Sequence, residues 1–130
     1  MAASEPHPVL PRPITRTDCV RASGQSRPQD ACAHHIVALN DDRAALSRRR
    51  LFGWLIAIND ADNGVFLPRY TSRPLPAHPQ APHHGIELHT PVYHAAVYAR
   101  LRGAGANDPA AGRQRLRSIR QQLLVDTFPR

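Results

Sequence analysis

The sequence predicts a small α+β fold with the order strand, helix, turn, strand, helix, helix. Two short runs rich in β-branched residues read as strands, and two helix starts combine a capping side chain with a proline at the first helical position. A chain of 130 residues suits one domain. Thirteen prolines and only one Trp, three Tyr and three Phe limit its core, so a bound metal would help to stabilise it.

The first strand is expected at residues 32–39, where Ile36 and Val37 are β-branched. An acidic turn at 40–42 then supplies the cap and first turn of a helix at 42–54. The inward side of this helix is expected to carry Leu46, Leu51 and Leu55. A brief extended piece is expected at 56–58.

The second half of the chain starts with Asn63-Gly64, a hairpin-type dipeptide that precedes a strand at 65–67. Residues 69–82 contain four prolines and should be irregular. Thr90 is the predicted cap of a helix that runs to about Arg102. Asp108 caps a last helix to about Val125, with Leu116, Ile119 and Leu123 on its inward face.

The N-terminal residues 1–31 carry five prolines and little periodicity, so we expect an extended or disordered leader before a domain at 32–126. Cys19 and Cys32 form no disulfide framework, and a zinc site that joins them to His34 is a weak alternative. The sequence shows no signal segment and no membrane-length apolar run. We expect a cytoplasmic protein, or one exported through a secretion system without a classical signal peptide.

All seventeen basic residues are arginines, and the net charge is +7. The planar guanidinium forks suit bidentate phosphate contacts, which favours a nucleic-acid partner, although a solvated surface is the alternative. Three arginines of the last predicted helix share one face and are candidates for backbone contacts: Arg113, Arg117 and Arg120.

Three short segments combine several histidines with one asparagine. They are Cys32-Ala33-His34-His35-Ile36-Val37, Asn63-Gly64-Val65-Phe66-Leu67-Pro68 and His83-His84-Gly85-Ile86-Glu87-Leu88-His89-Thr90. From about Ala33 to Leu124 the chain resembles the AHH family of HNH/endonuclease VII-type nucleases, which are often toxin domains. The resemblance implies a ββα-metal (His-Me finger) core, in which a β-hairpin is backed by a helix.

By this resemblance, His34 and His89 are metal ligands for one divalent ion: Mg, Mn, Ni or Zn. A further ligand is His84 or His83, and we expect His84 because it lies nearer to the helix. His78 and His94 are read as surface residues.

The catalytic residues implied by the resemblance are His35 and Asn63. His35 takes the general-base position, and the Asn63 side chain would brace the loop that carries the histidines. Adjacent residues of a strand point to opposite faces, so a vicinal pair can divide metal binding from water activation. The sequence departs from the family at Leu55, where the family often has a glycine.

The expected function is therefore hydrolysis of phosphodiester bonds in nucleic acid, with DNA expected over RNA. The family implies a bacterial toxin that a cognate immunity protein neutralises. The alternatives are an RNase on the same scaffold, or a non-catalytic nucleic-acid-binding module that keeps salt-sensitive binding without cleavage.

Overall fold

The computed structural model describes residues 26–85 and 88–130 of the chain. Its elements follow in the order β1 (Ala31–His35), the 3-10 turn η1 (Asp42–Ala44), α2 (Ala45–Gly53), the 3-10 turn η2 (Ala61–Asn63), β2 (Gly64–Pro68), α3 (Pro91–Arg102) and α4 (Pro109–Leu124). The predicted α+β class is confirmed, and a two-stranded sheet with three helices is compatible with a ββα nuclease core. None of the described helices is long and apolar enough to cross a membrane.

The two strands pair antiparallel, with His34 opposite Val65 and His35 opposite Gly64. The first strand ends at His35 and not at residue 39, so the predicted length was wrong. The Ile36 N–H still donates to the carbonyl of Asn63, the next residue in register, at 2.8 Å. The Val37 N–H donates instead to the Asn63 side chain at 2.8 Å, so the backbone pairing ends there.

Both predicted caps of the later helices are confirmed. The Thr90 side chain accepts a hydrogen bond from the Tyr93 backbone N–H at 3.1 Å, and Pro91 occupies the first turn of α3. The Asp108 carboxylate accepts from the Ala111 N–H at 3.0 Å and starts α4. Each cap satisfies a backbone donor that the first turn of a helix leaves without a partner.

Two of the three leucines predicted on the inward side of α2 point outwards. Leu51 is fully buried, whereas Leu46 is 50 % exposed and Leu55 64 % exposed. The helix packs through Ser47 and Leu51, which lie one turn apart, so the position before Ser47 faces solvent. Leu55 follows the end of the helix in a left-handed conformation with φ 60°.

No strand forms at residues 56–58, where an extended piece was expected. Ile56 is buried in the core, and the Asp60 N–H closes a turn onto the Ala57 carbonyl at 2.9 Å.

Most of residues 1–31, the predicted leader, and Cys19 with its predicted zinc site lie outside the described residues. The first strand begins at Ala31, the last residue assigned to that leader.

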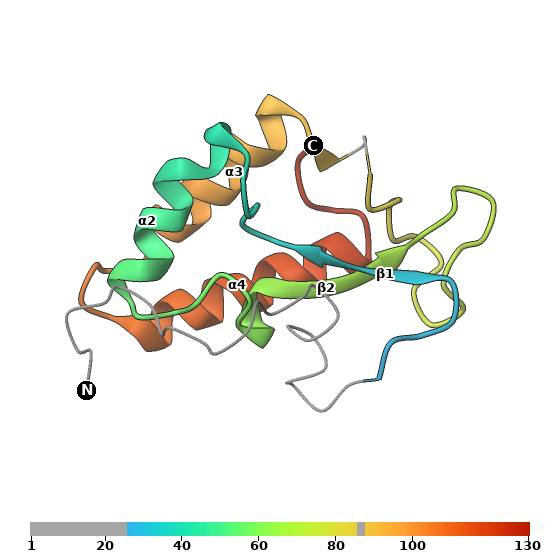
Figure 1. Cartoon of the computed structure of the whole chain (residues 1–130), viewed down its shortest axis with the longest axis horizontal. Helices are drawn as coiled ribbons and strands as arrows, with labels where there is room; N and C mark the ends of the chain where they lie inside the picture. The colour runs from blue at the N-terminus through green and yellow to red at the C-terminus, as the bar shows by residue number, and fades with distance from the viewer. Residues whose placement is uncertain (1–25, 86–87) are drawn as a thin grey trace.

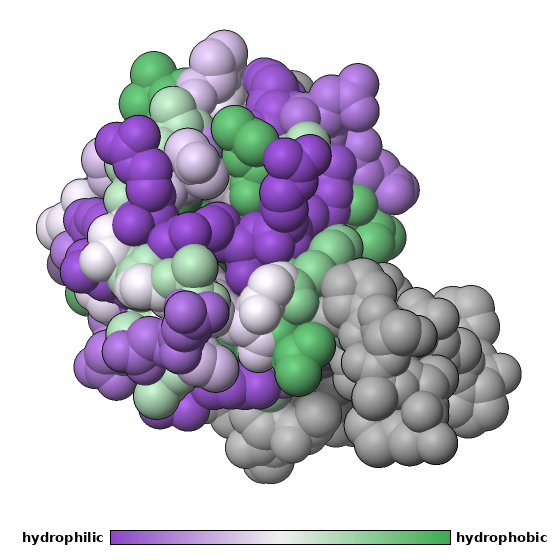
Figure 2. Space-filling view, turned by 90° about the vertical axis from the view of Figure 1, so that its left-hand side faces the viewer, coloured by the Kyte–Doolittle hydropathy of each residue, from purple (hydrophilic) through white to green (hydrophobic). Residues whose placement is uncertain are grey.

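The main core lies between one face of the sheet and the helices. In Figure 1, α4 runs along the two strands, while α2 and α3 pack beside one another at the strand end where β1 finishes. Alternate residues of a strand face opposite sides, so Val65 and Leu67 join this core, while Phe66 and Ala33 belong to a smaller cluster. On the face shown in Figure 2, hydrophobic residues form only small patches between hydrophilic ones.

Candidate active site

The Asn63 side chain ties together the two loops that flank the paired histidines. It is fully buried. Its Oδ1 accepts from the Val37 N–H at 2.8 Å, and its Nδ2 donates to the carbonyls of Val37 at 3.2 Å and Ile58 at 2.8 Å. Only an amide side chain both accepts and donates in this way. The hydrogen bonds that the predicted brace requires are therefore present, and the part of Asn63 in catalysis stays a prediction.

His34 is held by a buried tyrosine from the first turn of α3. The Tyr93 hydroxyl has one hydrogen and donates it to the Ile36 carbonyl at 2.6 Å. Its oxygen can therefore only accept from His34 Nε2, which lies 3.2 Å away. The proton of the neutral His34 ring thus lies on Nε2, and Nδ1 carries the lone pair that a metal could bind. Burial raises the pKa of Tyr93, so the hydroxyl stays protonated.

His35, the predicted general base, is 5 % exposed at the end of β1. Its Nε2 lies 2.6 Å from Oδ1 of Asn59, in the turn before η2. The two residues are far apart in the sequence, and the clamp made by Asn63 brings their loops together. Asn59 is a residue of the site that the sequence analysis did not identify.

The described part of the chain brings together three side chains that could hold a metal ion. One ligand atom from each of Asp41, His89 and His94 lies within 4.8 Å of the others. His89 was predicted as a ligand. His94 was read as a surface residue, and this was wrong: it is 4 % exposed, because it faces inwards from the first turn of α3. Asp41 was recognised only as part of a helix cap.

The charges of this group suit a divalent cation. Burial lowers the pKa of His94 despite the neighbouring carboxylate of Asp41, so its ring is neutral near pH 7. Hydrogen bonds from the Arg43 side chain and backbone hold the pKa of Asp41 well below its usual range. His94 Nε2 is buried, lies 3.4 Å from the Asp41 carboxylate and makes no hydrogen bond with the residues that the structure describes. Neutral imidazoles and an ionised carboxylate are the forms that bind metals, so the group fits.

Two members of this candidate metal-binding group, Asp41 and His89, line one hollow of about 180 Å³ together with the paired histidines. Its walls include His34, His35, Asp41 and His89, with the 38–40 loop completing them. The ring centres of His34 and His89 are 6.0 Å apart. The structure therefore places a candidate base, an acidic group and two candidate ligands around the same small space.

The other predicted ligand, His84, does not line this hollow or join the group of three. Its backbone N–H donates to the Pro68 carbonyl at 3.2 Å, and its ring lies against that of His83 at 4.6 Å. His83 Nε2 in turn lies 2.7 Å from the Arg69 carbonyl. A metal-binding role of either residue stays a prediction.

The three arginines predicted to contact nucleic acid all form ion pairs or hydrogen bonds with other residues of the protein. Arg113 bonds to the carboxylates of Asp60 and Asp62 at 2.9 Å each, and Arg117 bonds to Asp62 at 3.1 Å. The third, Arg120, donates to the Gly64 carbonyl at 2.9 Å and to the Ala61 carbonyl at 2.5 Å. They anchor α4 to the turn that precedes β2, and their role in binding phosphate stays a prediction.

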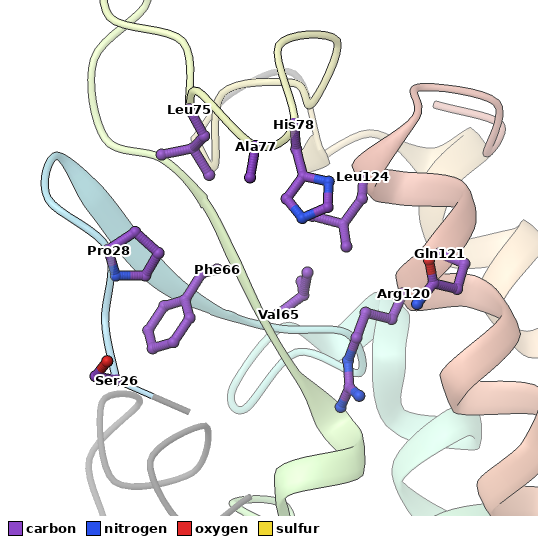
Figure 3. A pocket seen from close by; sticks show the side chains of 10 residues that line it. All are labelled: Ser26, Pro28, Val65, Phe66, Leu75, Ala77, His78, Arg120, Gln121 and Leu124. Atoms are coloured by element: carbon purple, nitrogen blue, oxygen red, sulfur yellow. The ribbon is translucent and has the colours of Figure 1, made fainter. Parts of the chain in front are cut away.

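A larger hollow of about 530 Å³ lies beside β2 and away from the paired histidines. Figure 3 shows it between β2, the irregular 69–82 segment and α4, with mainly apolar walls such as Phe66, Leu75 and Leu124. Arg120 stands at its edge. The residues that the structure describes place no group of metal ligands there.

The comparison with family profiles decides the relationship. Residues 18–124 match AHH, described as a nuclease family of the HNH/ENDO VII superfamily with conserved AHH. The chain belongs to the AHH family. Its Ala33-His34-His35 is the motif in the name of the family.

The predicted family assignment is confirmed. Because AHH is a nuclease family, the candidate site is considered for nuclease chemistry. No curated protein and no solved structure matches the chain significantly. The match begins at residue 18, inside the predicted leader, and the domain boundary at residue 32 stays a prediction. The histidines of the AHH motif stand at the hollow, which gives this nuclease a single candidate site among the described residues.

Proposed function

We propose that this AHH-family chain is a metal-dependent endonuclease that hydrolyses phosphodiester bonds of DNA. One observation carries the proposal: His35, Asp41 and His89 line the same hollow, and a ligand atom of His94 lies within 4.8 Å of those of Asp41 and His89. A hydrolytic nuclease needs a base for the attacking water and positive charge beside the phosphate, and here both can act on one phosphate.

In this mechanism His35 accepts a proton from water as the water oxygen forms its bond to phosphorus. The opposite P–O ester bond breaks, and solvent protonates the leaving oxygen. Asp41, His89 and His94 would hold the divalent ion. His34, which the family motif implies as a further ligand, would stand beside them. When bound, the ion neutralises negative charge on the phosphate. Asn63 holds the loops around His35 in place and does not touch the reacting atoms.

A plasmid-nicking assay tests the chemistry. We expect cleavage with Mn²⁺, Ni²⁺ or Zn²⁺ to exceed cleavage with Mg²⁺, because imidazole nitrogens suit transition metals better than the harder Mg²⁺. His35→Ala should lower the rate by about 10²- to 10⁴-fold, the usual contribution of a general base. His78→Ala, on the wall of the other hollow, is the control. Equal rates for His35→Ala and the parent would show that His35 is not the base.

A second experiment distinguishes the two candidate ligand sets without needing activity. Ni²⁺ or Zn²⁺ binding is measured by calorimetry for His94→Gln and His84→Gln. If Asp41, His89 and His94 form the site, His94→Gln should weaken binding by more than about tenfold, since even partners of ligands have effects of that size. His84→Gln should bind like the parent. The reverse result would favour the ligands predicted from sequence.

The finer assignments rest on the family and on charge. We propose DNA as the substrate, a role as a bacterial toxin with a cognate immunity protein, and action in the cytoplasm, including that of a competitor after export. The net charge of +7 supports binding to a polyanion. Offering DNA and RNA side by side tests the substrate. Expression in bacteria tests toxicity, which should disappear with His35→Ala.

A further inference from the structure

The candidate base contacts a residue to which the AHH motif gives no role. His35 Nε2 lies 2.6 Å from the side-chain oxygen of Asn59. We propose that Asn59 is a positioning residue for His35: it keeps the ring proton on Nε2 and so keeps the lone pair on Nδ1. The proposal deepens the nuclease function above and rests on it.

The argument starts from the chemistry of the two groups. A neutral imidazole carries one N–H, and either nitrogen can hold it. An amide oxygen only accepts hydrogen bonds, so the Nε2 that it contacts must be the donor. Nδ1 of His35 is then the atom able to take a proton from water. With the proton on Nδ1 instead, the ring could not act as a base through that atom.

Asn59 can orient the His35 ring because hydrogen bonds hold the residues on both sides of Asn59 in place. The carbonyl of Ile58 accepts a hydrogen bond from Asn63 Nδ2 at 2.8 Å. The carboxylate of Asp60 accepts from the Asp62 N–H and from Arg113, each at 2.9 Å. The turn that presents the amide is thus anchored both to the loop after β1 and to α4, which packs against η2 in Figure 1.

This arrangement also gives the Arg113 guanidinium an indirect effect on the site. Hydrogen bonds to Asp60 and Asp62 raise the pKa of Arg113, so it stays charged and keeps both contacts. Arg113 is the fifth residue of α4, a helix that contributes no residue to the lining of the hollow. Asn59 directly precedes Asp60 and lies three residues before Asp62. The ion pairs of Arg113 with these two carboxylates therefore fix the turn whose amide contacts His35.

The orientation of the Asn59 amide decides which ring nitrogen of His35 carries the proton. If Nδ2 rather than Oδ1 faced His35, it would donate to Nε2 and force the proton onto Nδ1. Asn59→Asp separates the two arrangements, because a carboxylate has the size of the amide and can only accept. If Oδ1 faces the ring, the aspartate preserves the contact, whereas alanine removes it.

The test combines the position of the ring proton with turnover. Two-bond ¹H–¹⁵N correlations of the full chain report which nitrogen of His35 is protonated, with His35→Ala identifying the signal. We expect Nε2–H in the parent and in Asn59→Asp, and a mixture of both forms in Asn59→Ala. The kcat of Asn59→Ala should fall about 10- to 100-fold, the effect of removing the partner that orients a functional histidine. Asn59→Asp should restore most of it.

Asn107→Asp and Asn107→Ala are matched controls, since Asn107 is exposed in the connection between α3 and α4. Thermal unfolding of each variant shows whether a loss of kcat reflects a loss of fold. Nδ1–H in the parent, or an Asn59→Ala variant with unchanged ring signals, would overturn the proposal. If the parent cuts no nucleic acid with any metal, the nuclease function fails, while the ring spectra still report on the contact.

Discussion

Replacing Asn63 by alanine should strongly destabilise this protein, even though the residue does not line the hollow of the candidate site. The Asn63 side chain is fully buried and makes three hydrogen bonds to the backbones of Val37 and Ile58. Alanine would leave one N–H and two carbonyls without these partners. These groups lie in the interior, where water replaces a lost partner poorly.

The size of the effect follows from the number of bonds. At a net value of about 1 kcal/mol for each hydrogen bond, the loss is about 3 kcal/mol, and buried groups left without a partner increase it. For a domain of this size, a loss of about 3 kcal/mol corresponds to a Tm lower by about 12–24 °C. A typical domain has only about 5–15 kcal/mol of stability, so the variant should stay folded only in mild conditions.

Urea unfolding, followed by circular dichroism, measures the change. The midpoint should move to lower urea while the slope of the free energy against urea stays the same. Asn107→Ala is the control, because a substitution at an exposed asparagine should change stability by less than about 0.5 kcal/mol. A loss below about 1 kcal/mol for Asn63→Ala would refute the reasoning, because it would mean that the two loops do not depend on the amide.

Three further outcomes can be checked by the same unfolding measurements. Leu55→Gly should raise the free energy of unfolding by about 0.5–1 kcal/mol, because φ is 60° there, the side chain is 64 % exposed and glycine avoids the left-handed penalty; a destabilised variant would contradict this. Gly112→Ala should lower the free energy of unfolding by about 1–3 kcal/mol, since the new Cβ would lie 2.5 Å from the Trp54 ring. An unchanged urea midpoint would show that the ring moves freely. Burial favours a raised pKa of Asp62, but hydrogen bonds from Arg117 and Arg113 outweigh it and lower that pKa. The unfolded chain then binds the proton more readily, so stability should fall as the pH drops below about 4, and Asp62→Asn should weaken this dependence.

The position of Leu55 also explains a departure from the family that the sequence alone left open. The resemblance to the family implied a glycine at this place, directly before the Ile56-Ala57-Ile58 segment. The backbone of Leu55 lies in the left-handed region, where glycine carries no steric penalty. The difference from the family therefore concerns the turn after α2 and leaves the residues around the hollow unchanged.

Local physical chemistry determined the parts of this fold that the sequence predicted well. The limits of α3 and α4 follow from a capping side chain and a proline within a few residues, and the strand at 64–68 follows from Asn63-Gly64 and an apolar run. The AHH motif is likewise contiguous, so it identified the family without any knowledge of the fold.

Only the tertiary structure decided which distant side chains meet. Asp41 and His94 join His89 because η1 packs against α3, and Asn59 reaches His35 because Asn63 draws their loops together. No local pattern marks such pairs, since an aspartate that caps a turn and a histidine on a helix look the same in sequence whether or not a partner faces them. Contacts between elements depend on how helices and strands pack, and that is a property of the whole folded chain.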